Sequence, residues 1–96
     1  MNIYKIEQKE VRGYDTYDSA VVCCDCEDQA RDMNPRRQWD MSLKPPGYVS
    51  ERIDWRLQEE GYTEWATKRE NVKVTLLGKA EPGTPFGVIC ASFNAG

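Results

Sequence analysis

Two runs near the start of the chain decide its fold: NIYKIEQ at residues 2–8 and TYDSAVVCC at residues 16–24. The first alternates and is rich in β-forming residues, and the second ends in a continuous apolar stretch. Gly13 interrupts the chain between them. The sequence therefore predicts two strands joined by a loop.

A short helix is predicted directly after the second run. Asp25 can cap a helix over residues 26–33, in which Cys26, Ala30 and Met33 fall on one narrow apolar stripe. An Asn-Pro dipeptide then stops the helix. The stripe is expected to lie on the sheet.

Two further strands are predicted near the C-terminus. VKVTL at residues 72–76 alternates as a half-buried strand that ends at Gly78, and EPGTP at residues 81–85 is a turn by composition. GVICASF at residues 87–93 is a nearly continuous apolar run. Such a run indicates a more central strand.

The segment between these two halves, residues 36–71, is predicted to be a variable helical insert. It holds all the tryptophans of the chain, Trp39, Trp55 and Trp65, together with a PPG breaker at residues 45–47. Large apolar side chains in so polar a segment either complete a small core or contact a partner.

A helix is predicted over residues 49–60 of the insert. Val49, Ile53 and Leu57 share one face by their spacing, whereas Trp55 lies about 200° round from Ile53. Trp55 is therefore expected to point away from the core and to be the exposed tryptophan, while the other two fill the core. The alternative is a sandwiched helix that buries both faces.

These elements together predict the fold class. A chain of 96 residues suffices for one domain with one modest core. The predicted order is strand, strand, helix, helical insert, strand, strand. We therefore expect a single α+β domain over residues 1–96, in two layers, with helices on one face of a mostly antiparallel four-stranded sheet.

Charge and composition narrow the function classes. A net charge of -3 with no cluster of basic residues argues against direct binding to nucleic-acid phosphates. The first residues carry charges where a signal peptide needs an apolar run, and no stretch of about eighteen apolar residues occurs. The sequence therefore predicts a cytoplasmic protein with no membrane span.

Neither catalysis nor metal binding is favoured. The chain contains no histidine, which is the commonest general base near neutral pH. Cys23, Cys24 and Cys26 are too closely spaced for the usual zinc-binding pairs, and Cys90 is the sole remaining thiol. We expect free, reduced cysteines, largely buried, with a metal or redox role as the lesser alternative. No enzyme activity, metal or cofactor is predicted.

Protein binding is the function that the sequence favours. Trp55, Trp39 and Trp65 lie near arginines or other aromatic residues, a combination typical of interface anchors. An acidic edge is the second candidate contact, formed by Asp15, Asp18, Asp28 and Asp32. Such an edge can imitate nucleic acid in the basic groove of a partner, or it can be a solvated surface that caps a helix.

Several segments resemble a group of small uncharacterised proteins from phages and bacteria. They are GYDTYDSAVV at residues 13–22, ARDMNP at residues 30–35, VTLLG at residues 74–78 and GVICASFNAG at residues 87–96. The resemblance covers both ends of the chain and not the insert. It implies a phage or prophage accessory protein, a class in which inhibitors of host machinery, including anti-CRISPR proteins, are common.

We therefore predict a small phage-type accessory protein that binds a host protein stoichiometrically, such as a nucleic-acid-binding effector of a CRISPR defence system. Two alternatives stay open. A small-ligand or nucleotide-binding protein would have a concave pocket lined by Trp and Tyr. A structural or oligomeric accessory protein, such as a homodimer, would pair an exposed edge strand across a two-fold axis.

Overall fold

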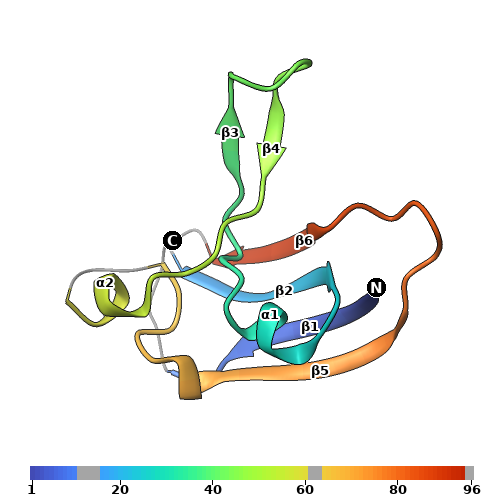
Figure 1. The fold of residues 1–96 in the computed structure, drawn as a ribbon. Coiled ribbons are helices and arrows are strands. Elements are labelled where there is room, and N and C mark those ends of the chain that lie inside the picture. Colours follow the sequence, from blue (N-terminus) through green and yellow to red (C-terminus); the bar gives the residue numbers. More distant parts are fainter. Residues whose placement is uncertain (11–15, 61–63, 95–96) are drawn as a thin grey trace.

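Four antiparallel strands form the main sheet of the computed structural model, which describes residues 1–10, 16–60 and 64–94. The strands are β1 (Asn2–Gln8), β2 (Thr16–Cys24), β5 (Val72–Lys79) and β6 (Gly87–Asn94), in the spatial order β5-β1-β2-β6 (Figure 1). All pairings between them are antiparallel. The predicted α+β domain with a four-stranded antiparallel sheet is confirmed.

One face of this sheet carries the core. Tyr4 lies opposite Val22 and Ile6 opposite Ala20, so alternate residues of β1 and β2 point to the same side and are buried there. Helix α1 (Glu27–Arg31) lies across this face and contacts β1, β2 and β5 (Figure 1). The protein therefore has the predicted two layers.

Helix α1 is shorter than predicted and begins one residue later. Cys26 is its N-cap residue, with extended backbone angles, and is exposed rather than buried in the stripe. The predicted cap at Asp25 is wrong, because Asp25 lies one position too early and its N–H donates to Gln29 Oε1 at 2.8 Å. Ala30 and Met33 are buried, as the stripe predicts.

Strand β6 lies at an edge of the sheet. The prediction that residues 87–93 form a central strand is wrong, because β1 and β2 occupy the two middle positions. The chain crosses the end of the sheet over residues 80–86 and returns beside β2 (Figure 1). Val88 is buried, whereas Ile89 and Phe93 are exposed.

The insert is mostly not helical. Its described residues, 36–60 and 64–71, form two short strands that pair with each other, one short helix and a 3-10 turn: β3 (Gln38–Asp40), β4 (Gly47–Val49), α2 (Trp55–Glu60) and η1 (Arg69–Asn71). The predicted helix over residues 49–60 is therefore wrong in its first half. Val49 belongs to β4, where it pairs with Gln38.

Residues 50–53 are extended because they pair with the chain that follows α1. The contacts are an antiparallel bridge between Met33 and Arg52, a 2.8 Å bond from Asn34 N–H to the Glu51 carbonyl, and a 2.7 Å bond from Ile53 N–H to the Asp32 carbonyl. The predicted stripe of Val49, Ile53 and Leu57 does not form. Ile53 is buried and Leu57 is exposed.

The tryptophans fall into different environments. Trp65 is 2% exposed and belongs to the core, whereas Trp39 is 53% exposed. Trp55 is partly buried and packs against the core. The expectation that Trp55 is the exposed tryptophan is therefore wrong, because α2 begins at this residue and its indole donates to Asp32 at the end of α1. The expectation that Trp39 fills the core is wrong as well, whereas that for Trp65 is confirmed.

This difference can be measured with two alanine variants. Trp65→Ala is expected to lower the free energy of unfolding by about 3–5 kcal/mol, since it removes a buried aromatic side chain and leaves a cavity. Trp39→Ala, the control, is expected to change it by less than about 1 kcal/mol. Urea denaturation followed by circular dichroism gives both values. Equal losses in the two variants would contradict the burial described above.

Candidate functional site

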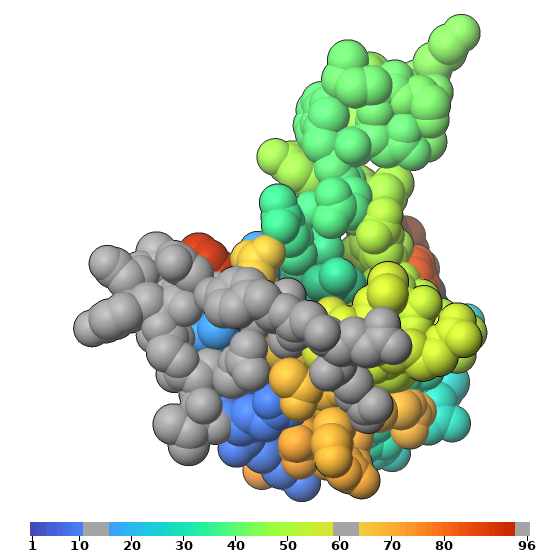
Figure 2. Space-filling model, turned by 90° about the vertical axis from the view of Figure 1, so that its left-hand side faces the viewer, coloured from blue at the N-terminus to red at the C-terminus, as the bar shows by residue number. Residues whose placement is uncertain are grey.

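Strands β3 and β4 form an arm that projects from the body of the protein. We define the arm as residues 37–49; Figures 1 and 2 show it standing clear of the sheet and helices. Trp39 pairs with Tyr48 across the hairpin, and their rings meet edge to face with centroids 5.0 Å apart. The Arg37 guanidinium lies 5.0 Å from the centre of the Tyr48 ring.

The arm exposes large apolar side chains. Four of them are between 39% and 72% exposed: Trp39, Met41, Leu43 and Tyr48. Apolar groups concentrated on a projecting element mark an interaction surface more often than they mark a monomer's ordinary surface. Aromatic residues, Met and Arg are also the types enriched at protein interfaces.

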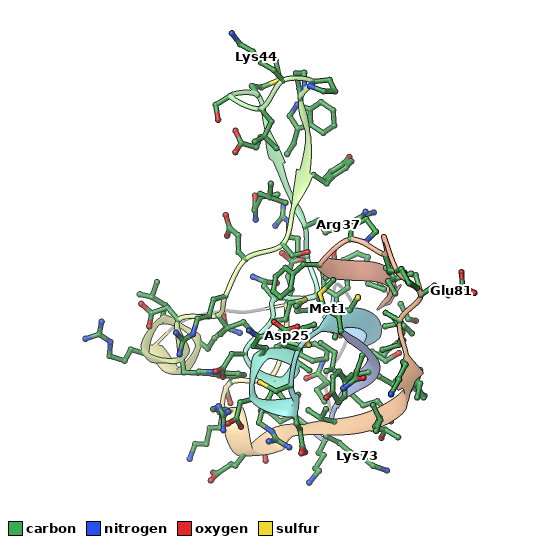
Figure 3. All side chains as sticks on the ribbon, turned by 45° about the vertical axis from the view of Figure 1, so that its right-hand side comes forward. Met1, Asp25, Arg37, Lys44, Lys73 and Glu81 are labelled. Carbon is green, nitrogen blue, oxygen red and sulfur yellow. The ribbon has the colours of Figure 1, made fainter. Side chains whose placement is uncertain are left out.

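The arm has a charge opposite to that of the whole chain. The arm contains two positively charged residues, Arg37 and Lys44, and one carboxylate, Asp40, whereas the net charge of the whole chain is -3. Figure 3 shows Lys44 at the outer end of the arm and Arg37 near its base. Asp40 accepts hydrogen bonds from the Ser42 backbone N–H and hydroxyl, and these lower the pKa of its carboxyl.

A groove of about 310 Å³ runs between the base of the arm and β6. It is lined by Tyr17, Pro35, Arg37, Tyr48, Val88, Ala91 and Phe93. Tyr17 and Phe93 form a tilted ring pair with centroids 4.8 Å apart. The apolar surface of the arm thus continues onto the edge of the sheet.

The acidic edge is partly neutralised. Arg69 bridges two of its members, with Nη2 3.1 Å from Asp28 Oδ1 and Nε 2.7 Å from Asp32 Oδ1. The side chain of Asp28 is 81% exposed, whereas that of Asp32 is 15% exposed. The fold brings these two candidate residues together and points Asp32 inwards.

Asp32 accepts hydrogen bonds from two distant side chains. Trp55 Nε1–H donates to Oδ1 at 2.9 Å, Arg69 donates to the same oxygen, and Arg52 Nη2 lies 3.7 Å from Oδ2. Burial alone would raise the pKa of Asp32, but these donors and the two positive charges outweigh it and hold the pKa below its ordinary value. Asp32 is therefore a structural carboxylate.

The remaining acidic candidates are separate from this pair. Asp18 is exposed on β2, at an irregularity where Tyr17 pairs with Phe93 and Ser19 pairs with Ser92. Asp15 lies outside the described residues.

A second carboxylate ties the insert to the sheet. Glu10 accepts bonds from the Thr67 backbone N–H at 2.8 Å, from the Thr67 hydroxyl at 3.1 Å and from Asn71 Nδ2 at 3.0 Å. Burial raises the pKa of Glu10, but the hydrogen bonds from Asn71 and Thr67 prevail and lower it.

A depression of about 470 Å³ lies beside α1. Its lining comprises Asp28, Gln29, Asp32, Met33, Ser50, Glu51, Arg52 and Phe86. Among the residues that the structure describes, neither Trp nor Tyr contributes to it, so this lining differs from the aromatic pocket expected of a small-ligand site.

The four cysteines differ in burial. Cys23 and Cys24 are buried, whereas Cys26 and Cys90 are exposed, and all are free. Burial raises the pKa of the Cys24 thiol to about 11, so this thiol stays protonated at neutral pH. In the described part of the chain, no three His, Cys, Asp or Glu side chains are grouped so that they could hold a metal ion.

No helix among the described residues is both long and apolar enough to cross a membrane. Comparisons with protein-family models, with curated proteins and with solved structures found no match to the chain.

Sequence reasoning missed most of the arm. Of its exposed residues only Trp39 was a candidate, and Met41, Leu43 and Tyr48 were not. A signal was present: Trp39, Met41 and Leu43 alternate as on one face of a strand, directly before a PPG turn sequence.

The role of Asp32 predicts a pH-dependent loss of stability in Asp32→Asn. Because the folded pKa of Asp32 is lowered, its charged form stabilises the fold above the unfolded pKa of about 4, and this contribution disappears as pH falls through the lower folded pKa. At pH 7 the free energy of unfolding of the variant should be about 1–3 kcal/mol lower than that of the wild type. The difference should shrink below about pH 4.

Urea denaturation at pH 7, 5 and 3 measures this difference. The matched control is Asp18→Asn, which removes the same charge from an exposed position and should change stability by less than about 0.5 kcal/mol at each pH. A loss in Asp32→Asn that stays constant down to pH 3 would show that the carboxylate charge is not what stabilises the fold.

Proposed function

We propose that this protein acts by stoichiometric binding to another protein, and that the arm makes the contact. The observation that carries this proposal is the exposure of Trp39, Met41, Leu43 and Tyr48 on one projecting hairpin. Exposing these side chains to water is unfavourable by about 25 cal/mol per Å² of apolar surface, a cost that a partner relieves by covering them.

The base of the arm is fixed before any partner binds. The chain enters the arm after residues 32–36 and leaves it at residues 50–53, and backbone hydrogen bonds and a β-bridge join residues 32–34 to residues 51–53. Arg36 Nη1 adds a 2.8 Å ion pair with Glu64 Oε1 where the chain enters the arm. An arm held in this way loses little conformational freedom on binding, which favours affinity.

The chemistry of the arm defines the kind of partner. Edge-to-face packing of Trp39 and Tyr48 holds two aromatic anchors on one element, and such anchors fill apolar pockets. Arg37 and Lys44 favour carboxylates around that pocket. We therefore propose a protein partner with an apolar groove and an acidic rim.

The biological setting of this protein is a second, more specific proposal. The resemblance of both ends of the chain to small phage and bacterial proteins supports an accessory protein of phage type that binds and inhibits a component of a host defence system such as CRISPR. The acidic edge gives less support to nucleic-acid imitation, because Arg69 pairs with both Asp28 and Asp32.

The test is affinity capture from a bacterial host lysate at low and then moderate salt, with three tagged proteins. They are the wild type, the double variant Trp39→Ser/Tyr48→Ser, and the control Leu57→Ser, which changes an exposed apolar residue on α2 outside the arm. We expect one protein to be captured near one-to-one by the wild type and the control. The arm variant should retain at least about tenfold less of it, since losing an interface anchor costs about 2 kcal/mol or more.

Circular dichroism must show that the arm variant remains folded. Equal capture by the arm variant would refute the role of the arm, and no stoichiometric partner in any host lysate tested would refute the binding function. A captured protein with no part in host defence would refute the inhibitor proposal alone.

A further inference from the structure

The two edges of the main sheet differ in how they are protected. An edge strand presents unpaired backbone N–H and C=O groups, and soluble proteins guard such edges with lysines, prolines or irregularities. Strand β5 has two exposed lysines, Lys73 and Lys79, and an irregularity in its pairing near Leu77. This edge is therefore guarded against addition of another strand.

Strand β6 lacks two of these guards, lysine and proline. Its sequence, GVICASFN, contains neither a charged residue nor a proline. Its pairing with β2 is irregular at two places: at Ile89, close to its first residues, and opposite Ser92 and Phe93, where Asp18 is the extra residue of β2. Next to the first of these places, Ser50 Oγ accepts the Val88 N–H at 2.8 Å, so the insert covers the beginning of the edge. The part of β6 from Cys90 onwards has no comparable cover among the described residues.

We propose that two copies of this chain pair through β6, antiparallel, so that the sheet continues from one copy into the other. In a two-fold interface each residue near the axis faces its own symmetry mate or a close neighbour of it. A charged residue there would face a like charge, which destabilises a cross-strand pair. Among the four strands of the main sheet, β6 is the one without a charged residue, so it suits pairing with itself.

The side chains of β6 also suit this pairing. Ile89 and Phe93 are exposed at the two ends of the strand. A two-fold axis at Ala91 brings Ile89 of each copy, which is the extra residue of the bulge, near Phe93 of the other. Aromatic and β-branched residues form favourable cross-strand pairs.

The groove beside β6 adds area to the interface. A stable interface covers about 800 Å² on each partner, more than one edge strand supplies. The groove at the base of the arm opens next to Ala91 and Phe93, so side chains of an added strand that point to the α1 face can enter it. In Figure 1 the arm rises past β6, in the direction in which the sheet would grow.

A charge placed at Ser92 tests the pairing. Ser92 is exposed, lies next to the expected axis and is not part of the arm. Sedimentation equilibrium from about 1 µM to about 1 mM should show a dimer for the wild type and at least about tenfold weaker association for Ser92→Lys. Thr75→Lys is the matched control, because it adds the same charge to an exposed polar residue of β5, and it should dimerise like the wild type.

A charge swap distinguishes pairing at β6 from a general effect of added charge. Ser92→Glu alone should also dimerise weakly, whereas an equimolar mixture with Ser92→Lys should recover a mixed dimer, because opposite charges then lie close together across the axis. Mixing Thr75→Lys with Thr75→Glu should change nothing.

Three results would overturn the proposal: a monomeric wild type over the whole concentration range, undiminished dimerisation of Ser92→Lys, or no recovery in the mixture. If the wild type is monomeric, the occupant of the β6 edge would be a strand of another protein and not a second copy of this chain. Failure here leaves the proposed function intact, because the Ser92 variants do not alter the arm.

Discussion

The carboxylate of Asp32 holds together three segments that are far apart in the sequence. It lies at the end of α1, accepts bonds from Trp55 and Arg69, and its own backbone carbonyl accepts the Ile53 N–H. Each of these bonds has a charged or backbone partner, and the two side-chain bonds are partly buried, so losing one leaves a costly unsatisfied group. The path of the insert depends on this arrangement: residues 50–53 lie extended against the chain at the end of α1, and helix α2 begins only at Trp55.

The strands could be predicted from the sequence because their signal is local. Alternation in residues 2–8 and the apolar ending of residues 16–24 reflect which side chains face the core, and the bounds of β1 and β2 agree with them. The position of β6 could not be predicted in this way. A continuous apolar run arises in a central strand buried on both faces, and equally in an uncharged edge strand, and sequence periodicity does not separate the two.

The candidate site could not be predicted from local sequence patterns, because its position depends on contacts between residues far apart in the sequence. Val49, Ile53 and Leu57 are spaced as on a helix, but three residues are a weak signal, and the bridge between Met33 and Arg52 overrides it. Once helix α2 begins at Trp55, the indole can reach Asp32, 23 positions earlier in the chain. Trp39 is left as the exposed tryptophan because its neighbours pair with β4 outside the body, where no core is available to cover it.

The distribution of charge follows from the same contacts. Arg69 and Arg52 are remote in sequence from the run of acidic residues around α1, yet the fold places both beside Asp32. The acidic appearance of that run therefore overstates the field it presents to a partner. The arm differs in this respect: its Arg37 stacks on Tyr48 and keeps its charge at the surface, beside apolar groups that water solvates poorly. Cationic and apolar surface thus coincide on the arm, which stands away from the body. That coincidence, rather than the acidic edge, makes the arm better suited than the other described surfaces to recognise another protein.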